Sequence, residues 1–421
     1  MNIKKIEQEP SFNSKEQKTN LDEIEQRLGL LKEKIREDSP EMVQEIKSLR
    51  ELDIDSTLQE AERILPLETE GGAKKAIELI EKGWSLVKRE IILVEPGHGK
   101  GHLLRDAINA LRLVGDKEQD FSSTEAFTGI MIAGISHDIG CTAVKRYQET
   151  ERLIRHGEAG ALLVGDFLNS LKVEKPLVNL IKYGIAAHTH YLKPYEIKGE
   201  IVRPYRDTKE GNPYLAIWLP RWIDRLDTNG PGFVARHFLT LLETHKDYGK
   251  DGFYEVEFNK HMNPAIEKGT MLNHLKMFAD SQDGKSPYSR FDHLSKRMVE
   301  LRDAQTARLR KIIEAVSAPV LSPTSVSIED ILNKWQQFLV KIEPVRNTRR
   351  TASELIKRFK TLPYEWQVRW SRGFETTMAE YNDWEEEAKK DIERISQKFP
   401  FLQETTFFKD LLSFLQPTPS P

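Results

Sequence analysis

Residues 129–140 read GIMIAGISHDIG, an apolar segment that ends in an adjacent histidine and aspartate, His137 and Asp138, followed by Gly140. The apolar run predicts a buried helix that Gly140 terminates. At a helix end that faces an interior site, both polar side chains can reach a metal ion. A carboxylate has two oxygens and can bridge two ions, whereas an imidazole serves one. The pair alone is a weak signal, and its meaning depends on the rest of the chain.

Histidines are concentrated in one part of the chain. None of the 11 lies in residues 1–97 or 294–421, and six fall between positions 98 and 190. These six are His98, His102, His137, His156, His188 and His190. Neutral imidazole is the commonest metal ligand, and an isolated buried histidine is costly without a hydrogen bond. The clustering therefore indicates a polar or metal site, and we expect the other five to be ordinary surface or hydrogen-bonded residues.

Helical spacing dominates the chain and predicts an all-α fold. A mostly helical stretch runs from Gly101 to about His245, and further long helices are predicted over 287–317 and from about Tyr364 to Gln397. The aromatic stripe of the last helix is typical of a core. Residues 197–219 contain glycine and proline and suggest a short hairpin or excursion, and residues 249–258 form a second strand candidate.

The N-terminal region starts with about 20 polar residues that we expect to be disordered. Apolar residues then alternate spacings of three and four from Leu21 to Ile35. This stripe either packs on the protein's own body or forms a homodimerisation arm. Ser39 and Pro40 have the character of an N-cap and a first helical residue.

Three regions are expected: an N-terminal arm (1–55), a core with a helical extension (56–300) and a C-terminal helical region (301–421). Residues 57–90 have a helical pattern, which we expect to be interrupted at Pro66 and at Gly71-Gly72. The segment LSPTSVS (321–327) is a linker by composition, with Ser327 a candidate N-cap, and the tail QPTPSP is expected to be disordered.

Composition excludes several classes of protein. The 421 residues carry a net charge of −3, which provides no global field for wrapping nucleic acid. Cys141 is the single cysteine, so an intrachain disulfide framework is excluded and a reducing, cytoplasmic location is expected. No apolar stretch has the length of a membrane span or a signal peptide. The segment around Gly99 and Lys100 fails the Walker pattern at Val94 and Gly101.

Two further residues extend the His137-Asp138 pair into an ordered set. His102 opens the amphipathic stretch HLLRDAINALRL, and Asp224 lies in WLPRWIDRLDTNG. With the opening HxxR (His102 and Arg105), the apolar helix leading into HDIG and the xDRLD ending, the chain resembles the HD-domain metal-dependent phosphohydrolase superfamily. The resemblance covers about residues 80–245 and implies an all-helical bundle.

The resemblance also implies a metal centre. His102, His137, Asp138 and Asp224 would hold one divalent cation, and His156, His188 and His190 would complete a site for a second. Asp138 would bridge the two, Asp138 and His137 would be the catalytic residues, and a hydroxide would attack phosphorus. The alternative is a mononuclear site in which these histidines form hydrogen bonds with the substrate phosphate or with each other. His98 is a further candidate ligand in place of His102.

Mixed nitrogen and oxygen ligation suits Mn, Fe, Co, Ni or Zn, with Mg less favoured. Basic residues near the ligands are candidates for binding a substrate phosphate, because arginine pairs with phosphate oxygens in a bidentate manner. These candidates are Arg105, Lys145, Arg146, Arg203 and Arg206.

Two departures limit the choice of substrate. Cys141 stands where HD-GYP phosphodiesterases have lysine after HDIG, and no GYP triplet follows AAHTH, so this chain is not a typical member of that subgroup. Cys141 is expected to be a packing residue. The predicted function is hydrolysis of a phosphomonoester or phosphodiester, with a nucleotide as the expected substrate.

The alternative function is a nucleic-acid-binding or nucleotide-sensing scaffold on the same fold. Basic residues gather in the C-terminal region, namely Arg346, Arg349, Arg350, Lys357, Arg358 and Lys360. Such a cluster attracts phosphate, although basic stretches are more often solvated helix faces balanced by acids.

Overall fold

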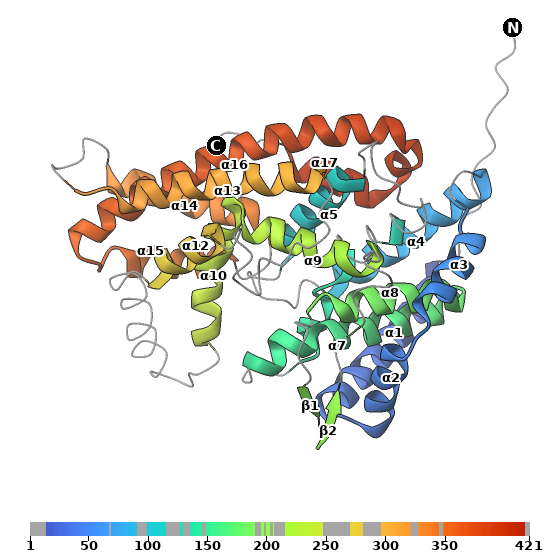
Figure 1. Ribbon diagram of the computed structural model, residues 1–421. Coiled ribbons are helices and arrows are strands. Elements are labelled where there is room, and N and C mark those ends of the chain that lie inside the picture. Colours follow the sequence, from blue (N-terminus) through green and yellow to red (C-terminus); the bar gives the residue numbers. More distant parts are fainter. Residues whose placement is uncertain are drawn as a thin grey trace, which may run out of the picture.

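The computed structural model describes residues 14–66, 69–90, 99–114, 127–128, 135–144, 149–189, 195–197, 199–202, 205, 215–246, 270–280, 296–320, 327–344 and 348–416. Within these ranges the fold is all-α, as predicted, with one short hairpin (Figure 1). Strand β1 (Tyr195–Ile197) pairs antiparallel with β2 (Glu200–Val202), and the turn contains Gly199 at φ 80°. The hairpin lies at the start of the predicted excursion. The second strand candidate, 249–258, lies outside the described residues.

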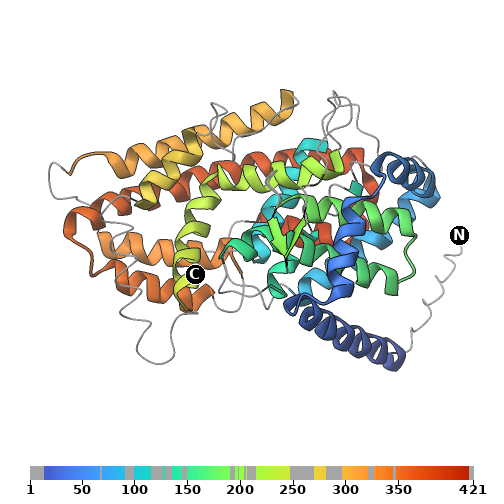
Figure 2. The same ribbon diagram turned by 60° about the horizontal axis from the view of Figure 1, so that its bottom comes forward.

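The N-terminal arm consists of α1 (Ser14–Arg36), α2 (Pro40–Arg50) and α3 (Ile54–Ile64). Helix α1 contacts α7 (Glu149–Ser170), and α2 and α3 contact α8 (Lys175–Ala187), so the arm covers one edge of the helical body (Figure 2). Leu28 and Ile35 of the apolar stripe are buried there. This packing is the first of the two alternatives raised by the stripe.

Two details of the arm bear on the predictions. Helix α1 begins at Ser14, so the prediction of disorder was wrong for residues 14–20. Ser39 caps α2 as predicted, since its side chain accepts a hydrogen bond from the Met42 N–H at 3.4 Å and Pro40 occupies the first turn.

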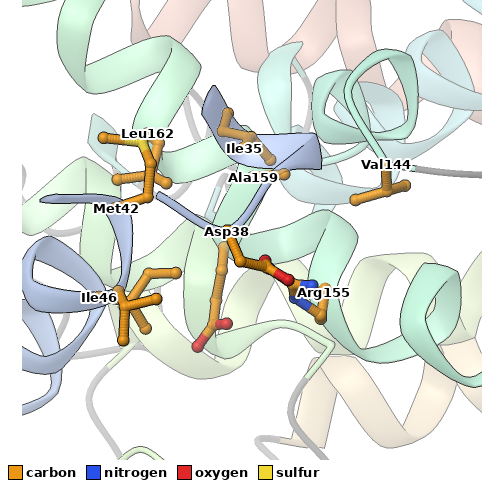
Figure 3. A pocket seen from close by; sticks show the side chains of 10 residues that line it. Ile35, Asp38, Met42, Ile46, Val144, Arg155, Ala159 and Leu162 are labelled. Atoms are coloured by element: carbon orange, nitrogen blue, oxygen red, sulfur yellow. The ribbon is translucent and has the colours of Figure 1, made fainter. Parts of the chain in front are cut away.

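A small pocket lies where α1 and α2 meet α7 (Figure 3). Apolar side chains, among them Ile35, Met42 and Leu162, form much of its lining, and the ion-paired side chains of Asp38 and Arg155 also line it. Arg155 therefore fastens the arm to α7. The pocket is a packing crevice between arm and body.

The central helices are α4 (Glu70–Glu90), α5 (Lys100–Val114), α7, α8, α9 (Leu215–Thr228) and α10 (Pro231–Lys246), together with the 3-10 helix η4 (Ile139–Thr142). Helices α7 and α8 pack against each other, and α9 contacts both α5 and α8. Gly71 and Gly72, predicted to break the chain, instead lie in the first turn of α4. Glycine is tolerated there because the first backbone N–H groups of a helix have no intrahelical partner.

The C-terminal region contains α12 (Thr270–Asp280), α13 (Lys296–Ser317), α14 (Ile328–Ile342), α15 (Thr348–Phe359), α16 (Tyr364–Lys398), the 3-10 helix η6 (Pro400–Glu404) and α17 (Thr406–Phe414). The long helix predicted to start at Tyr364 is confirmed. Its aromatic stripe is core, with Trp370, Phe374 and Tyr381 fully buried and Phe374 stacked on Trp335 at 4.3 Å between ring centroids. Ser327 caps α14 as predicted.

The C-terminal helices are continuous with the central body. Helix α16 packs against α5 as well as α13, and α10 contacts α13, α15 and α16 (Figure 1). The predicted boundaries at 55/56 and 300/301 fall inside α3 and α13, so neither coincides with a linker. None of the described helices has the length and apolar character needed to cross a membrane.

Candidate metal centre

His137 and Asp138 lie in a buried turn that leads into η4. The predicted helix over 129–134 lies outside the described residues. Ile135 and Ser136 are helical and the turn follows at His137, whereas Gly140, the predicted terminator, lies inside η4. A Cβ on Gly140 would lie 1.8 Å from the His156 carbonyl oxygen and 2.4 Å from the Gly160 nitrogen. Only glycine permits this approach, which brings Asp138 next to His156.

Four of the predicted histidines converge from four segments of the chain. The ring centroids of His102 (α5) and His137 are 5.4 Å apart, and those of His137 and His188 are 5.0 Å apart. His156 (α7) completes the group, 5.1 Å from His188. His188 follows α8, and its Nδ1 donates to the Ile185 carbonyl oxygen at 2.5 Å, so its Nε2 is directed into the cluster. His98 and His190 lie outside the described residues.

Asp138 stands between two pairs of imidazoles. Its Oδ2 is 3.2 Å from His102 Nε2 and 3.6 Å from His137 Nε2. Its Oδ1 is 3.2 Å from His156 Nε2 and 3.9 Å from His188 Nε2. Each oxygen thus faces a different pair, which is the arrangement that a carboxylate bridging two cations requires.

Asp224, the remaining predicted ligand, reaches the cluster from α9. Its Oδ1 lies 3.5 Å from His102 Nε2, and its side chain is 24% exposed, against 4% for Asp138. Asp224 is thus the most exposed of the predicted ligands that the structure describes, and the cluster is least covered on its side.

Sequence reasoning missed two charged residues of the cluster. Asp106 lies one helical turn after His102, with its Oδ2 3.2 Å from His102 Nε2 and 3.4 Å from His137 Nε2. The i,i+4 spacing places both side chains on one helix face and was a usable signal. Arg236 of α10 lies with Nη1 3.3 Å from Asp224 Oδ1 and Nη2 3.9 Å from Asp138 Oδ2. No motif in the sequence pointed to Arg236.

Arg105 was predicted to bind substrate, and in the structure its guanidinium contacts protein groups. The side chain is buried, its Nε donates to Asp227 Oδ1 at 2.7 Å, its Nη2 donates to Asp227 Oδ2 at 3.1 Å, and its Nη1 donates to the Ile342 carbonyl oxygen at 3.0 Å. Asp227 in turn accepts from His102 Nδ1 at 2.8 Å. A carboxylate on the second ring nitrogen fixes the tautomer and orientation of a ligating histidine. Arg105 therefore orients His102 through Asp227.

The C-terminal region contacts the N-terminus of α5, the helix that carries His102. Glu343, at the end of α14, accepts hydrogen bonds from the backbone N–H of Gly101 at 2.8 Å and of His102 at 3.2 Å. A carboxylate satisfies the orphan donors and the positive dipole end of a helix in this position. A Cβ on Gly101 would lie 1.7 Å from the Ile342 carbonyl oxygen, so α5 begins in direct contact with the end of α14.

Burial raises the pKa of Glu343 from 4.5 to about 7, against the opposing effects of Arg105 and the backbone donors. Its folded-state pKa lies above the unfolded value, so its contribution to stability is complete below about pH 4.5 and is lost as the pH rises through 7. We expect the unfolding free energy of chelator-treated protein to fall by up to about 3 kcal/mol from this group between about pH 5 and 8. Urea unfolding across that range should show a flatter profile for Glu343→Gln, and equal slopes for the two proteins would contradict this assignment.

The electrostatics of the cluster favour positive charge. Burial and Arg236 lower the pKa of His102, but the surrounding carboxylates outweigh them and raise it to about 10. Burial lowers the pKa of His137 to about 3, so this ring is neutral and able to act as a ligand. Burial acts to raise the pKa of Asp138, yet the four imidazoles hold it well below its ordinary value. The Asp138 carboxylate is therefore ionised.

The remaining predicted site residues are less informative. Lys145, Arg146, Arg203 and Arg206 lie outside the described residues. Cys141 is half-buried and packs against the hydrophobic core, as expected for a packing residue. Its sulfur also lies within 4.8 Å of ligand atoms of Asp138 and His156.

The C-terminal basic cluster is partly neutralised. Glu354 lies within ion-pair distance of both Lys357 and Arg358, and Glu329 pairs with Lys360. This is the balance by acids that a solvated helix face shows.

Comparisons of the chain with protein-family models, curated proteins and solved structures found no match.

Proposed function

We propose that this chain is a metal-dependent phosphohydrolase that hydrolyses a phosphomonoester or phosphodiester, with a nucleotide as the expected substrate. The observation that supports it most is the position of Asp138, whose two oxygens face two separate pairs of imidazoles. The order of the donors along the chain, His102, His137-Asp138 and Asp224, is that of the superfamily the sequence resembles.

The donor set fits divalent cations. Buried atoms in the cluster without a hydrogen-bond partner among the described residues include His102 Nε2 and Asp138 Oδ2. Leaving such atoms unsatisfied is costly, and a cation would satisfy both. Imidazoles and carboxylates together suit Mn, Fe, Co, Ni or Zn better than Mg, and a cation at His102 would displace the proton that the raised pKa of this ring retains. His102, His137, Asp138 and Asp224 would hold one cation, and Asp138, His156 and His188 a second.

Such cations lower the pKa of water, so that hydroxide forms near neutral pH, and they screen phosphoryl oxygens. The chain's own residues supply the rest. The Arg105–Asp227 pair orients the His102 ring, and Glu343 fixes the start of the helix that carries it. Arg236 lies beside Asp224, with its Nη1 3.3 Å from Asp224 Oδ1, and would be an N–H donor for a phosphate bound on this side of the cluster.

Metal removal tests the proposal. We expect the purified protein to contain Mn, Fe, Co, Ni or Zn by elemental analysis and to release p-nitrophenol from a generic phosphomonoester or phosphodiester. Treatment with a chelator should abolish this release, and adding back one of these cations should restore it. A nucleotide panel then identifies the substrate class. Protein that takes up no cation, or hydrolysis that survives complete metal removal, would refute the proposal.

A further inference from the structure

Asp106 is the buried carboxylate of the cluster that the predicted ligand set leaves unused. It lies on α5 with no exposed surface, and neither of its oxygens has a hydrogen-bond partner among the described residues. An ionised carboxylate in such a place is very costly unless a cation or a set of donors compensates for it. Asp106 is therefore a candidate ligand for a cation in the cluster.

The distances around Asp106 match those between atoms that share one cation. For bonds of about 2.1 Å, neighbouring ligand atoms lie about 3.0 Å apart in octahedral geometry and about 3.4 Å apart in tetrahedral geometry. Asp106 Oδ2 is 3.2 Å from His102 Nε2 and 3.4 Å from His137 Nε2. One ligand atom of Asp224 also lies within 4.8 Å of the atoms offered by these three residues.

The distribution of charged side chains also favours a cation next to Asp106. Asp227 forms an ion pair with Arg105, whose Nε lies 2.7 Å from its Oδ1, and Asp224 forms one with Arg236, whose Nη1 lies 3.3 Å from its Oδ1. Asp106 has no arginine or lysine in an ion pair with it among the described residues, whereas Arg236 lies 3.9 Å from Asp138. A cation between Asp106 and Asp138 would neutralise both carboxylates.

We propose that Asp106 is a fifth protein ligand of the cation held by His102, His137, Asp138 and Asp224. This inference rests on the proposed metal centre. Three carboxylate oxygens and two imidazoles make this site oxygen-rich and leave one octahedral position open. Such a set favours a cation that accepts five or six ligands, such as Mn²⁺, over the four-coordinate geometry common for Zn²⁺. Among the described residues, the site at His156 and His188 has fewer donors, and we expect it to be the weaker of the two.

Mn²⁺ binding tests the inference without reference to activity. Chelator-treated full-length protein is titrated with Mn²⁺ by calorimetry, and the Mn²⁺-induced rise in Tm is measured in parallel. We expect Asp106→Asn to weaken the tighter site by roughly 10-fold or more and to reduce the rise in Tm accordingly. The matched control is His188→Asn, which should retain the tighter site and alter the weaker one.

A second measurement on unmodified protein covers the case in which Asp106→Asn does not fold. The first equivalent of Co²⁺ should give the weak visible bands of five- or six-coordination, and intense tetrahedral bands would overturn the inference. Wild-type affinity and an unchanged Tm rise in Asp106→Asn would also overturn it, because a ligand cannot be lost without weakening the site. If the wild-type protein itself takes up no Mn²⁺ or Co²⁺, the proposed metal centre fails and this inference fails with it.

Discussion

Replacing Asp138 with alanine is expected to lower kcat/KM for a phosphoester by at least roughly 10³-fold, which corresponds to about 4 kcal/mol of transition-state stabilisation. The physical reason is that Asp138 contributes one oxygen to each half of the cluster, at 3.2 Å from His102 Nε2 and 3.2 Å from His156 Nε2. Its loss removes a donor from both proposed cation sites. The measurement is steady-state kinetics together with the metal content of the purified variant.

The control for this variant is Asp166→Asn, which removes one negative charge from α7 at a partly exposed position paired with Arg27. It should retain both metal and activity. Circular dichroism should show that Asp138→Ala keeps its helical content, because Asp138 lies in a turn and not within a helix. Unchanged activity and metal content in folded Asp138→Ala would remove the mechanism.

Replacing Arg105 with methionine is expected to destabilise the protein by about 3–5 kcal/mol, because it leaves Asp227 buried without its cationic partner. Asp227 holds the pKa of Arg105 above its ordinary value against the effect of burial, so the guanidinium is charged in the folded protein. The change also removes the donor to the Ile342 carbonyl oxygen, which links α5 to the C-terminal region. Urea unfolding of chelator-treated protein measures the loss.

Two comparisons isolate the cause. Arg394→Met, at a side chain that is 64% exposed, should change stability by no more than about 0.5 kcal/mol. The double variant Arg105→Met/Asp227→Leu removes both buried charges and should recover part of the lost stability. Its metal affinity should be lower than that of the wild-type protein, because His102 loses its orienting carboxylate. A higher KM with wild-type stability in Arg105→Met would instead return Arg105 to its predicted role as a substrate contact.

The metal cluster shows which parts of a site are readable from sequence. The structure brings together all the motif-predicted ligands that it describes, namely His102, His137, Asp138, His156, His188 and Asp224. Arg105 belongs to the same motif but has a different role, because a motif records a residue's position along the chain and not the partner that its side chain meets. Its partner Asp227 lies in another helix, 122 residues away.

The residues that were missed have a common character. Arg236 reaches the cluster from α10, and Glu343 contacts the start of α5 from the end of α14. Neither residue lies at a sequence spacing from a histidine that would predict this contact. Asp106 is different, because its i,i+4 relation to His102 was visible in the sequence. An acidic residue on an amphipathic helix is usually on the solvated face, and only the burial of that face distinguishes it.

Several features follow from the amino-acid sequence alone: the all-α class, the long C-terminal helix, the helix caps at Ser39 and Ser327 and most residues of the cluster. These features depend on local periodicity, capping chemistry and short motifs, which act over a few residues. Three other features depend on the packing of the folded chain: Asp138 lies between two imidazole pairs, Arg105 faces Asp227, and the C-terminal region caps the helix carrying His102. Those relations arise from the packing of helices distant in the chain, where close contacts at Gly101 and Gly140 set which backbones can meet.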